Sequence, residues 1–181
     1  RRLFPRDFTS GGAVVTVRRK CFVSYHYDDK PLVDRFVSVF GGNMIHRGME
    51  MTADIINSMD NDYVMRKIRE LYLMDSTVTI VLVGRCTWAR RYVDWEVQAS
   101  LRKPSSGHAN GLVAIQLDPS FKSLPHRVQL NVDSGYCKFY KWPSNTSKFG
   151  VIVEEAFRAR TEFASKIVNP RLRFERNKSC P

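Results

Sequence analysis

The chain has 181 residues, the size of one domain and enough to bury a sheet between two helix layers without disulfide support. Hydrophobic residues make up 43% and aromatic residues 12% of the sequence, which excludes an intrinsically disordered chain. The net charge of +11 suggests an anionic partner, and the lack of any run of about 18 apolar residues excludes a transmembrane helix.

The folded part is expected to follow an N-terminal arm of residues 1–19, which contains a Gly-Gly pair that favours irregular backbone. Residues 20–27 (KCFVSYHY) predict the first strand. An acidic pair and Pro31 then open a helix. Its apolar residues recur at spacings of three and four as far as Phe40, and a second Gly-Gly pair ends it.

The next segment has an ambiguous pattern, in which Met44 and Ile45 indicate a weak second strand followed by a long loop. Asn61 can cap a helix that continues to about Leu73. Residues 77–83 (TVTIVLV) form a continuous β-branched run, which is typical of a central parallel strand buried on both faces.

A further helix is predicted over residues 88–101, with Arg90 and Asp94 spaced for an exposed ion pair. Residues 111–117 (GLVAIQL) predict another buried strand. Residues 125–134 show little regular periodicity, so we expect a loop there.

The last predicted elements are a short strand at residues 136–142 and a helix at 149–168. One domain over residues 20–168 and a loose tail over 169–181 follow from this division. Strands that alternate with helices predict a parallel sheet of about five strands with helices on both faces.

Ligands bind such sheets at the carboxyl ends of the strands. Here those ends are residues 25–29, residues 84–88 and the segment from Asp118 onward. No GxGxxG motif follows the first strand and no phosphate-binding P-loop motif occurs, so any nucleotide is held in another way.

Metal and disulfide chemistry are not expected from the sequence. The four histidines share no ligand spacing, so we expect no metal site. The four cysteines include no CxxC pair, and we expect reduced thiols, with Cys21 as a small core residue.

Charged residues near two strand ends allow more than one interpretation. Asp28 and Asp29 could form an acidic pocket like that of a response-regulator receiver, but a helix cap is favoured. The receiver pattern also needs an aspartate after the third strand, where Arg85 follows a glycine. Arg85, Arg90 and Arg91 fit a local phosphate pocket, whereas most other basic residues are spread along the chain.

Glu96 is the candidate for chemistry within the helix over residues 88–101. It lies beside Tyr92, Val93 and Trp95, and a carboxylate next to aromatic residues in a cleft can have a shifted pKa. The alternative is an ordinary solvated helix glutamate, which periodicity alone favours.

Three segments together resemble the TIR-like family of bacterial Thoeris antiphage systems, the ThsB-type component. They are FVSYHYDD at 22–29, TVTIVLVG at 77–84 and TWARRYVDWEVQASL at 87–101, and the resemblance covers roughly residues 20–141. It implies a three-layer flavodoxin-like (TIR-like) α/β fold and places the NAD-cleaving glutamate of active TIR domains at Glu96. The chain lacks the usual Trp-Cys pair before this glutamate, has an unusual second-strand loop and carries an additional tail.

The resemblance implies cleavage of NAD to nicotinamide and ADP-ribose or a cyclic isomer, with Glu96 stabilising the charged ribose. NAD is then the substrate, and no cofactor is expected. The implied substrate-binding residues include an apolar slot for nicotinamide and arginines for the diphosphate. They are Tyr25, His26, Asp29, Gly84, Arg85, Trp88, Arg91 and Tyr92.

The resemblance also implies self-association through the TIR surface and a downstream effector that reads the nucleotide product. The chain start lacks the apolar stretch of a signal peptide, so we expect a cytoplasmic protein without a membrane partner. The main alternative is a non-enzymatic TIR-like scaffold. Nucleic-acid binding is a third hypothesis, disfavoured because no recognised binding motif occurs.

Overall fold

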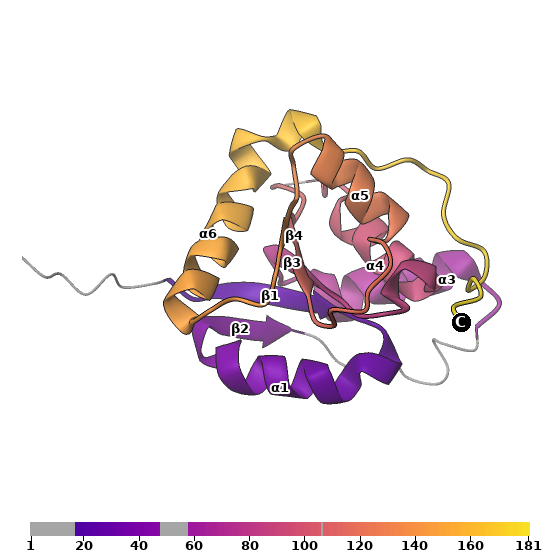
Figure 1. Ribbon diagram of the computed structural model, residues 1–181. Coiled ribbons are helices and arrows are strands. Elements are labelled where there is room, and N and C mark those ends of the chain that lie inside the picture. Colours follow the sequence, from indigo (N-terminus) through magenta and orange to yellow (C-terminus); the bar gives the residue numbers. More distant parts are fainter. Residues whose placement is uncertain (1–16, 48–57, 106) are drawn as a thin grey trace, which may run out of the picture.

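The computed structural model describes residues 17–47, 58–105 and 107–181. They contain an all-parallel five-stranded sheet with the order β2-β1-β3-β4-β5 (Figure 1). The strands are β1 (Arg19–Ser24), β2 (Met44–Arg47), β3 (Val78–Val83), β4 (Gly111–Gln116) and β5 (Lys138–Tyr140). Most of the arm expected over residues 1–19, and residues 48–57 of the expected long loop, lie outside the described residues.

Helices cover both faces of this sheet (Figure 1). They are α1 (Lys30–Phe40), α3 (Asn61–Lys67), α4 (Arg91–Ser100), α5 (His126–Asp133) and α6 (Thr146–Glu162). Helices α1 and α6 share one core with the sheet, while α3, α4 and α5 pack on the opposite face. The predicted three-layer α/β fold with a five-stranded parallel sheet is therefore confirmed.

Strand β3 is the centre of the sheet, as its β-branched sequence predicts. It pairs with β1 on one side and β4 on the other, and all six of its residues are buried. On one face, Ile80 and Leu82 join a core that includes the aromatic rings of Phe36 and Phe149. Burial on both faces explains why this strand has no polar-apolar alternation.

Helix α5 is absent from the sequence prediction, which placed a loop at residues 125–134. Its buried residues are Arg127, Val128 and Asn131, so two of the three are polar. Apolar periodicity therefore could not identify this helix. The polar residues are buried because they bond to other parts of the chain: Asn131 donates to the Val168 carbonyl at 2.8 Å, and Arg127 contacts α4.

The start of helix α3 differs from the prediction. Asp60, and not Asn61, caps α3, because its carboxylate accepts hydrogen bonds from the backbone N–H groups of Asp62 and Tyr63. A π-helical segment, Ile68–Leu73, continues this helix to the predicted end.

Arg127 and Asp94 form a buried ion pair between α5 and α4. Arg127 Nε donates to Asp94 Oδ1 at 3.0 Å, and the two side chains are 2% and 6% exposed. The predicted exposed ion pair between Arg90 and Asp94 is therefore wrong. Arg90 is the N-cap residue of α4, one turn before Asp94. Asp94 pairs with Arg127 instead, because the buried Arg127 guanidinium donates to both oxygens of the Asp94 carboxylate.

The same pair holds the C-terminal tail against the domain. Arg127 donates to the carbonyl oxygens of Pro170 and Leu172, both at 2.8 Å, and the Phe174 N–H donates to Asp94 at 3.0 Å. The tail then passes α4 toward α3 (Figure 1). The expectation of a loose tail is therefore wrong for residues 169–181.

A disulfide between Cys86 and Cys180 closes the tail onto the loop after β3. The expectation that all the cysteines are reduced is therefore wrong for these two. They are 94 residues apart, so no short spacing signals their pairing. Cys21 and Cys137 are free and buried, and Cys21 is a core residue as predicted.

None of the described helices is long and apolar enough to span a bilayer.

The Val81→Asp variant tests the central strand. It should lose its cooperative unfolding transition, because an unpaired charge enters a fully buried strand at a cost of several kcal/mol. Val151→Asp, on the exposed side of α6, is the control and should melt near the wild-type temperature. Thermal unfolding followed by circular dichroism checks this, and a cooperative Val81→Asp variant with a near-wild-type midpoint would contradict it.

The Arg127→Leu variant tests the buried ion pair. It should lower the free energy of unfolding by about 3 to 5 kcal/mol, because Asp94 then remains buried without its counter-charge. Arg158→Leu removes an exposed i,i+4 pair with Glu162 and should cost less than about 1 kcal/mol. Urea titration measures both, and equal losses in the two variants would show that the buried pair has no special role.

Candidate functional site

Glu96 lies at the meeting point of α4 and the carboxyl end of β1. Ser24 is the last residue of β1, and its Oγ donates a hydrogen bond to Glu96 Oε2 at 2.5 Å. Strand alternation sends Phe22 and Ser24 toward α3 and α4, while Cys21 and Val23 face the core under α1 and α6. The side chain of Glu96 therefore points toward the end of the sheet.

The environment of Glu96 favours its neutral form. Burial raises the pKa of the Glu96 carboxyl from its ordinary value of 4.5 to about 8, although the hydrogen bond from Ser24 lowers it in part. An ordinary solvated helix glutamate has no such shift. A carboxyl with a raised pKa at the carboxyl end of a parallel strand is a candidate for catalysis.

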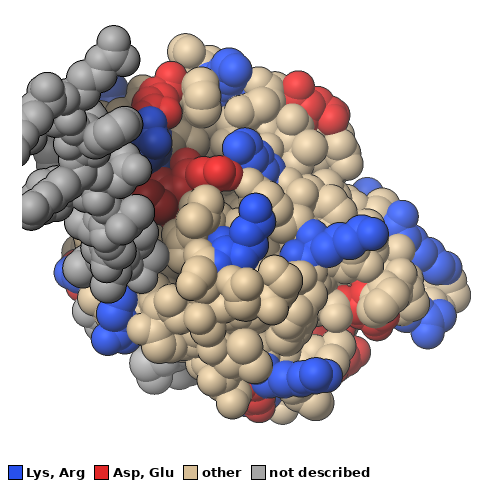
Figure 2. Space-filling model, turned by 60° about the vertical axis from the view of Figure 1, so that its left-hand side comes forward, with Lys and Arg blue, Asp and Glu red and all other residues tan. Residues whose placement is uncertain are grey.

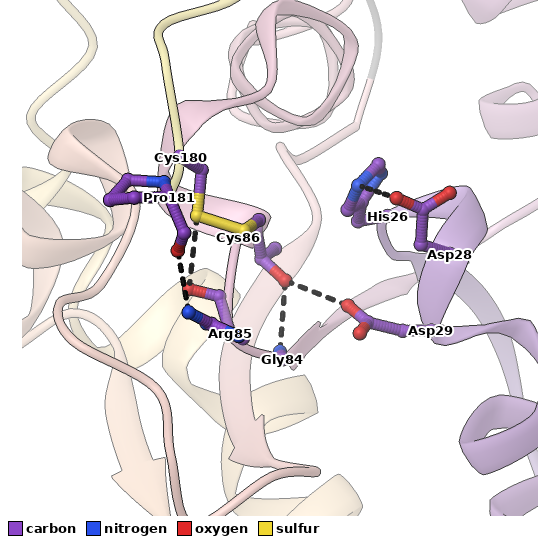
Figure 3. Close-up of a disulfide and its surroundings, with 9 residues drawn as sticks. His26, Asp28, Asp29, Gly84, Arg85, Cys86, Cys180 and Pro181 are labelled. Atoms are coloured by element: carbon purple, nitrogen blue, oxygen red, sulfur yellow. Dashed lines mark hydrogen bonds and ion pairs between the residues drawn. A yellow bond between two sulfur atoms is a disulfide. The ribbon is translucent and has the colours of Figure 1, made fainter.

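A second carboxylate, Asp29, lies at the ends of β1 and β3 (Figure 3). The Gly84 N–H donates to Thr87 Oγ1 at 2.8 Å, and the Thr87 hydroxyl donates to Asp29 Oδ2 at 3.2 Å. A Cβ atom at residue 84 would collide with the Asp29 carboxylate, so glycine permits this approach. Burial raises the pKa of Asp29, while the bond from Thr87 lowers it.

This geometry corrects the favoured interpretation of the acidic pair. Asp29 occupies the position before α1, but its side chain makes no capping hydrogen bond. Asp28 Oδ2 instead lies 3.0 Å from His26 Nε2, a contact that is an ion pair when the imidazole is protonated (Figure 3). Asp118, after β4, is near enough to raise the pKa of Asp29 further.

Among the described residues, no group of three or more His, Cys, Asp or Glu side chains is arranged to hold a metal ion.

Two aromatic residues expected at the nicotinamide slot, Trp88 and Tyr25, follow different strands. Trp88 is in the short 3₁₀ turn Thr87–Ala89, after β3, and its indole Nε1 is buried without a hydrogen-bond partner in the described chain. Tyr25 packs instead against the core shared by α1 and α6. Strand alternation therefore separates Tyr25 from Glu96, which contacts Ser24 on the other face.

The arginines expected at the diphosphate contact the C-terminal tail. Arg85 donates to the Pro181 carbonyl at 2.7 Å (Figure 3), and the Arg91 backbone N–H donates to Asn177 Oδ1 at 2.9 Å. The Arg91 guanidinium also donates to the Tyr92 hydroxyl at 2.7 Å. The tail therefore borders the site on the side of α4.

Ser24 and Thr87 are polar partners that the sequence analysis did not identify. Ser24 could have been found from strand alternation, because it is the polar position on the same side of β1 as Phe22. Thr87 could not, because its partner Asp29 is 58 residues away.

A comparison with protein families agrees with this architecture. Residues 22–121 match the family described as Thoeris protein ThsB, TIR-like domain. The matched span contains the end of β1, all of β3 and the whole of α4 with Glu96, and it covers more than half of the chain. No curated protein matches the sequence. The chain therefore belongs to the TIR-like domain family of ThsB, a protein of the Thoeris antiphage defence system.

Proposed function

We propose that this TIR-like domain cleaves NAD and releases nicotinamide, with Glu96 as the catalytic carboxylate. The observation that carries the proposal is the position of Glu96, which is partly buried at the carboxyl end of β1 and hydrogen-bonded to Ser24. Ligands of parallel α/β sheets bind at this edge. Family membership supports the same substrate.

In the proposed reaction, the bond between C1 of the ribose and the nicotinamide nitrogen breaks, and nicotinamide leaves with the electron pair. The ribose becomes an oxocarbenium ion, whose positive charge the Glu96 carboxylate stabilises. Water then adds at C1 and loses a proton to give ADP-ribose. Attack by a nitrogen of the adenine in the same molecule gives a cyclic isomer, the product that we favour for a signalling role.

The raised pKa of Glu96 fits this chemistry. In the free protein at neutral pH the carboxyl is largely protonated, because its pKa is about 8. The nicotinamide ring of NAD carries a positive charge, and a cation close to the carboxyl favours ionisation. Substrate binding therefore generates the carboxylate at the place where positive charge next appears on the ribose.

Other groups near the strand ends can bind the rest of the substrate. The unpartnered indole N–H of Trp88 can donate to the nicotinamide carboxamide, and a bound carbonyl would remove the cost of its burial without a partner. Arg85 donates one guanidinium hydrogen bond to the tail, and Arg91 donates one to the Glu175 carbonyl of the tail and one to the Tyr92 hydroxyl. A guanidinium has five N–H donors, so both arginines retain N–H groups for a diphosphate. Asp29, Gly84 and Tyr92 complete the proposed substrate-binding set.

The proposal places the protein in a signalling relay. A separate effector would read the nucleotide product, and association of TIR surfaces would control its synthesis. A non-enzymatic scaffold is the alternative. A scaffold gives no reason for a carboxyl with a raised pKa to lie against Ser24.

The Glu96→Gln variant tests the catalytic role. It should lose nicotinamide release, because the amide preserves the shape of the side chain and removes the charge that stabilises the oxocarbenium ion. Glu154→Gln, which changes a distant carboxylate paired with Arg19, is the control and should retain wild-type turnover. Chromatography of purified protein incubated with NAD measures release. Full activity of Glu96→Gln would remove Glu96 from the mechanism, and an inactive wild-type protein would favour the scaffold.

The pKa of Glu96 also predicts a pH-dependent stability. Between about pH 4.5 and about pH 8 the unfolded chain has lost this proton while the folded protein keeps it, so stability falls as pH rises through this window. Glutamine does not titrate, and Glu96→Gln should therefore gain melting temperature relative to wild type from pH 5 to pH 8. Differential scanning calorimetry at several pH values measures this. A difference that stays constant with pH would contradict the raised pKa.

A further inference from the structure

A cleft of about 780 Å³ lies between α3, the end of α4 and the C-terminal tail. It is lined by five arginines, which are Arg66, Arg69, Arg102, Arg171 and Arg173. Gln98 also lines it, two residues after Glu96 on α4. Residues two apart on a helix do not share a face, so the cleft is separate from the site around Glu96.

Most arginines of this cleft have no acidic partner within the described chain. Within the described chain, the guanidinium groups of Arg66, Arg69, Arg102 and Arg171 neither donate a hydrogen bond nor form an ion pair, although Arg66 lies over the ring of Tyr63. Like charges repel, so their convergence in one cleft favours a bound anion.

The acidic residues nearby offset only part of this charge. Asp62 lines the cleft and accepts a hydrogen bond from Arg173 at 3.2 Å. Burial lowers the pKa of Arg69, as do the positive charges of Arg102 and Arg173, whereas Asp62 and Glu70 raise it. The lowered pKa means that the surroundings of Arg69 remain net unfavourable for a cation.

The tail arginines are held in place by the fold. The carbonyl oxygens of Pro170 and Leu172, which flank Arg171, accept hydrogen bonds from the buried Arg127. The Arg171 carbonyl itself accepts from Gln98 at 3.1 Å. Three distant parts of the chain thus present arginines to one cleft, and these hydrogen bonds fix the backbone of the tail beside it.

We propose that this arginine cleft binds a small polyphosphate anion, either inorganic or the polyphosphate of a nucleotide. Guanidinium groups pair with phosphate oxygens through two parallel hydrogen bonds, and five of them match several phosphate charges. The volume of the cleft is within the range of small-molecule sites.

A long nucleic acid fits the surface less well, because it requires a continuous basic stripe. On the α6 face, Lys and Arg side chains stand in separate groups next to acidic ones (Figure 2). On α6, Glu154 pairs with Arg19 and Glu162 pairs with Arg158. The charges of Arg19 and Arg158 are therefore offset by carboxylates, whereas four of the five cleft arginines have no ion-pair partner within the described chain.

Isothermal titration calorimetry with the full chain tests the proposal, with tripolyphosphate, ATP and adenosine as probes. Tripolyphosphate and ATP should bind and adenosine should not. Equal affinities for the first two assign recognition to the phosphates alone, and tighter binding of ATP assigns the site to a nucleotide. Arg102→Gln and Arg69→Gln should each weaken binding about tenfold, the loss expected for one charge-assisted contact.

Two control variants separate this site from other causes of binding. Arg158→Gln lies outside the cleft and should bind as wild type does, and Glu96→Gln should do the same, because the catalytic carboxylate is elsewhere. An equal loss in Arg158→Gln would show that binding follows net charge alone and would overturn the proposal. Failure of tripolyphosphate and ATP to bind, or tighter binding of duplex DNA through the same arginines, would also overturn it.

Discussion

The buried ion pair between Arg127 and Asp94 holds α4, α5 and the C-terminal tail together. It joins α4 to α5 and, through three backbone groups, fixes the C-terminal tail to both helices. Two charges are taken out of water here, so each must be fully hydrogen-bonded, and the tail carbonyls satisfy the donors that the carboxylate leaves free. Glu96 is two residues after Asp94, and the pair therefore also holds the helix that carries the candidate catalytic group.

The two ends of the tail contribute to different surfaces of the domain. Near Arg171 the tail supplies part of the arginine cleft, whereas the disulfide to Cys86 and the contact with Arg85 bring its last residues to the loop after β3. That loop also contains Thr87, which bonds to Asp29. The tail is therefore a component of both surfaces that can bind anionic groups. The whole tail lies outside residues 22–121, the span that matches the ThsB family.

The candidate site contains two carboxyl groups from distant parts of the chain, each near the carboxyl end of a strand. Glu96 and Asp29 come from α4 and from the turn after β1, and burial raises the pKa of both. Each is bonded to one hydroxyl, from Ser24 or Thr87, which positions the carboxyl without neutralising it. This arrangement keeps two carboxyl groups near the strand ends without an arginine or lysine ion pair to either side chain in the described chain. Carboxyl groups with shifted pKa values at one edge are a feature of catalytic sites.

The parallel sheet, its central strand and the position of Glu96 on the helix after that strand could be predicted from the sequence. These follow from apolar periodicity and β-branched runs, which report burial within one element. Helix α5, the burial of Asp94, the Ser24–Glu96 hydrogen bond and the disulfide could not be predicted, because each depends on contacts between distant parts of the chain. The partners in the Arg127–Asp94, Ser24–Glu96 and Cys86–Cys180 pairs are 33, 72 and 94 residues apart. A buried polar residue shows no local pattern, because what makes its burial favourable is a partner that only the folded chain brings near.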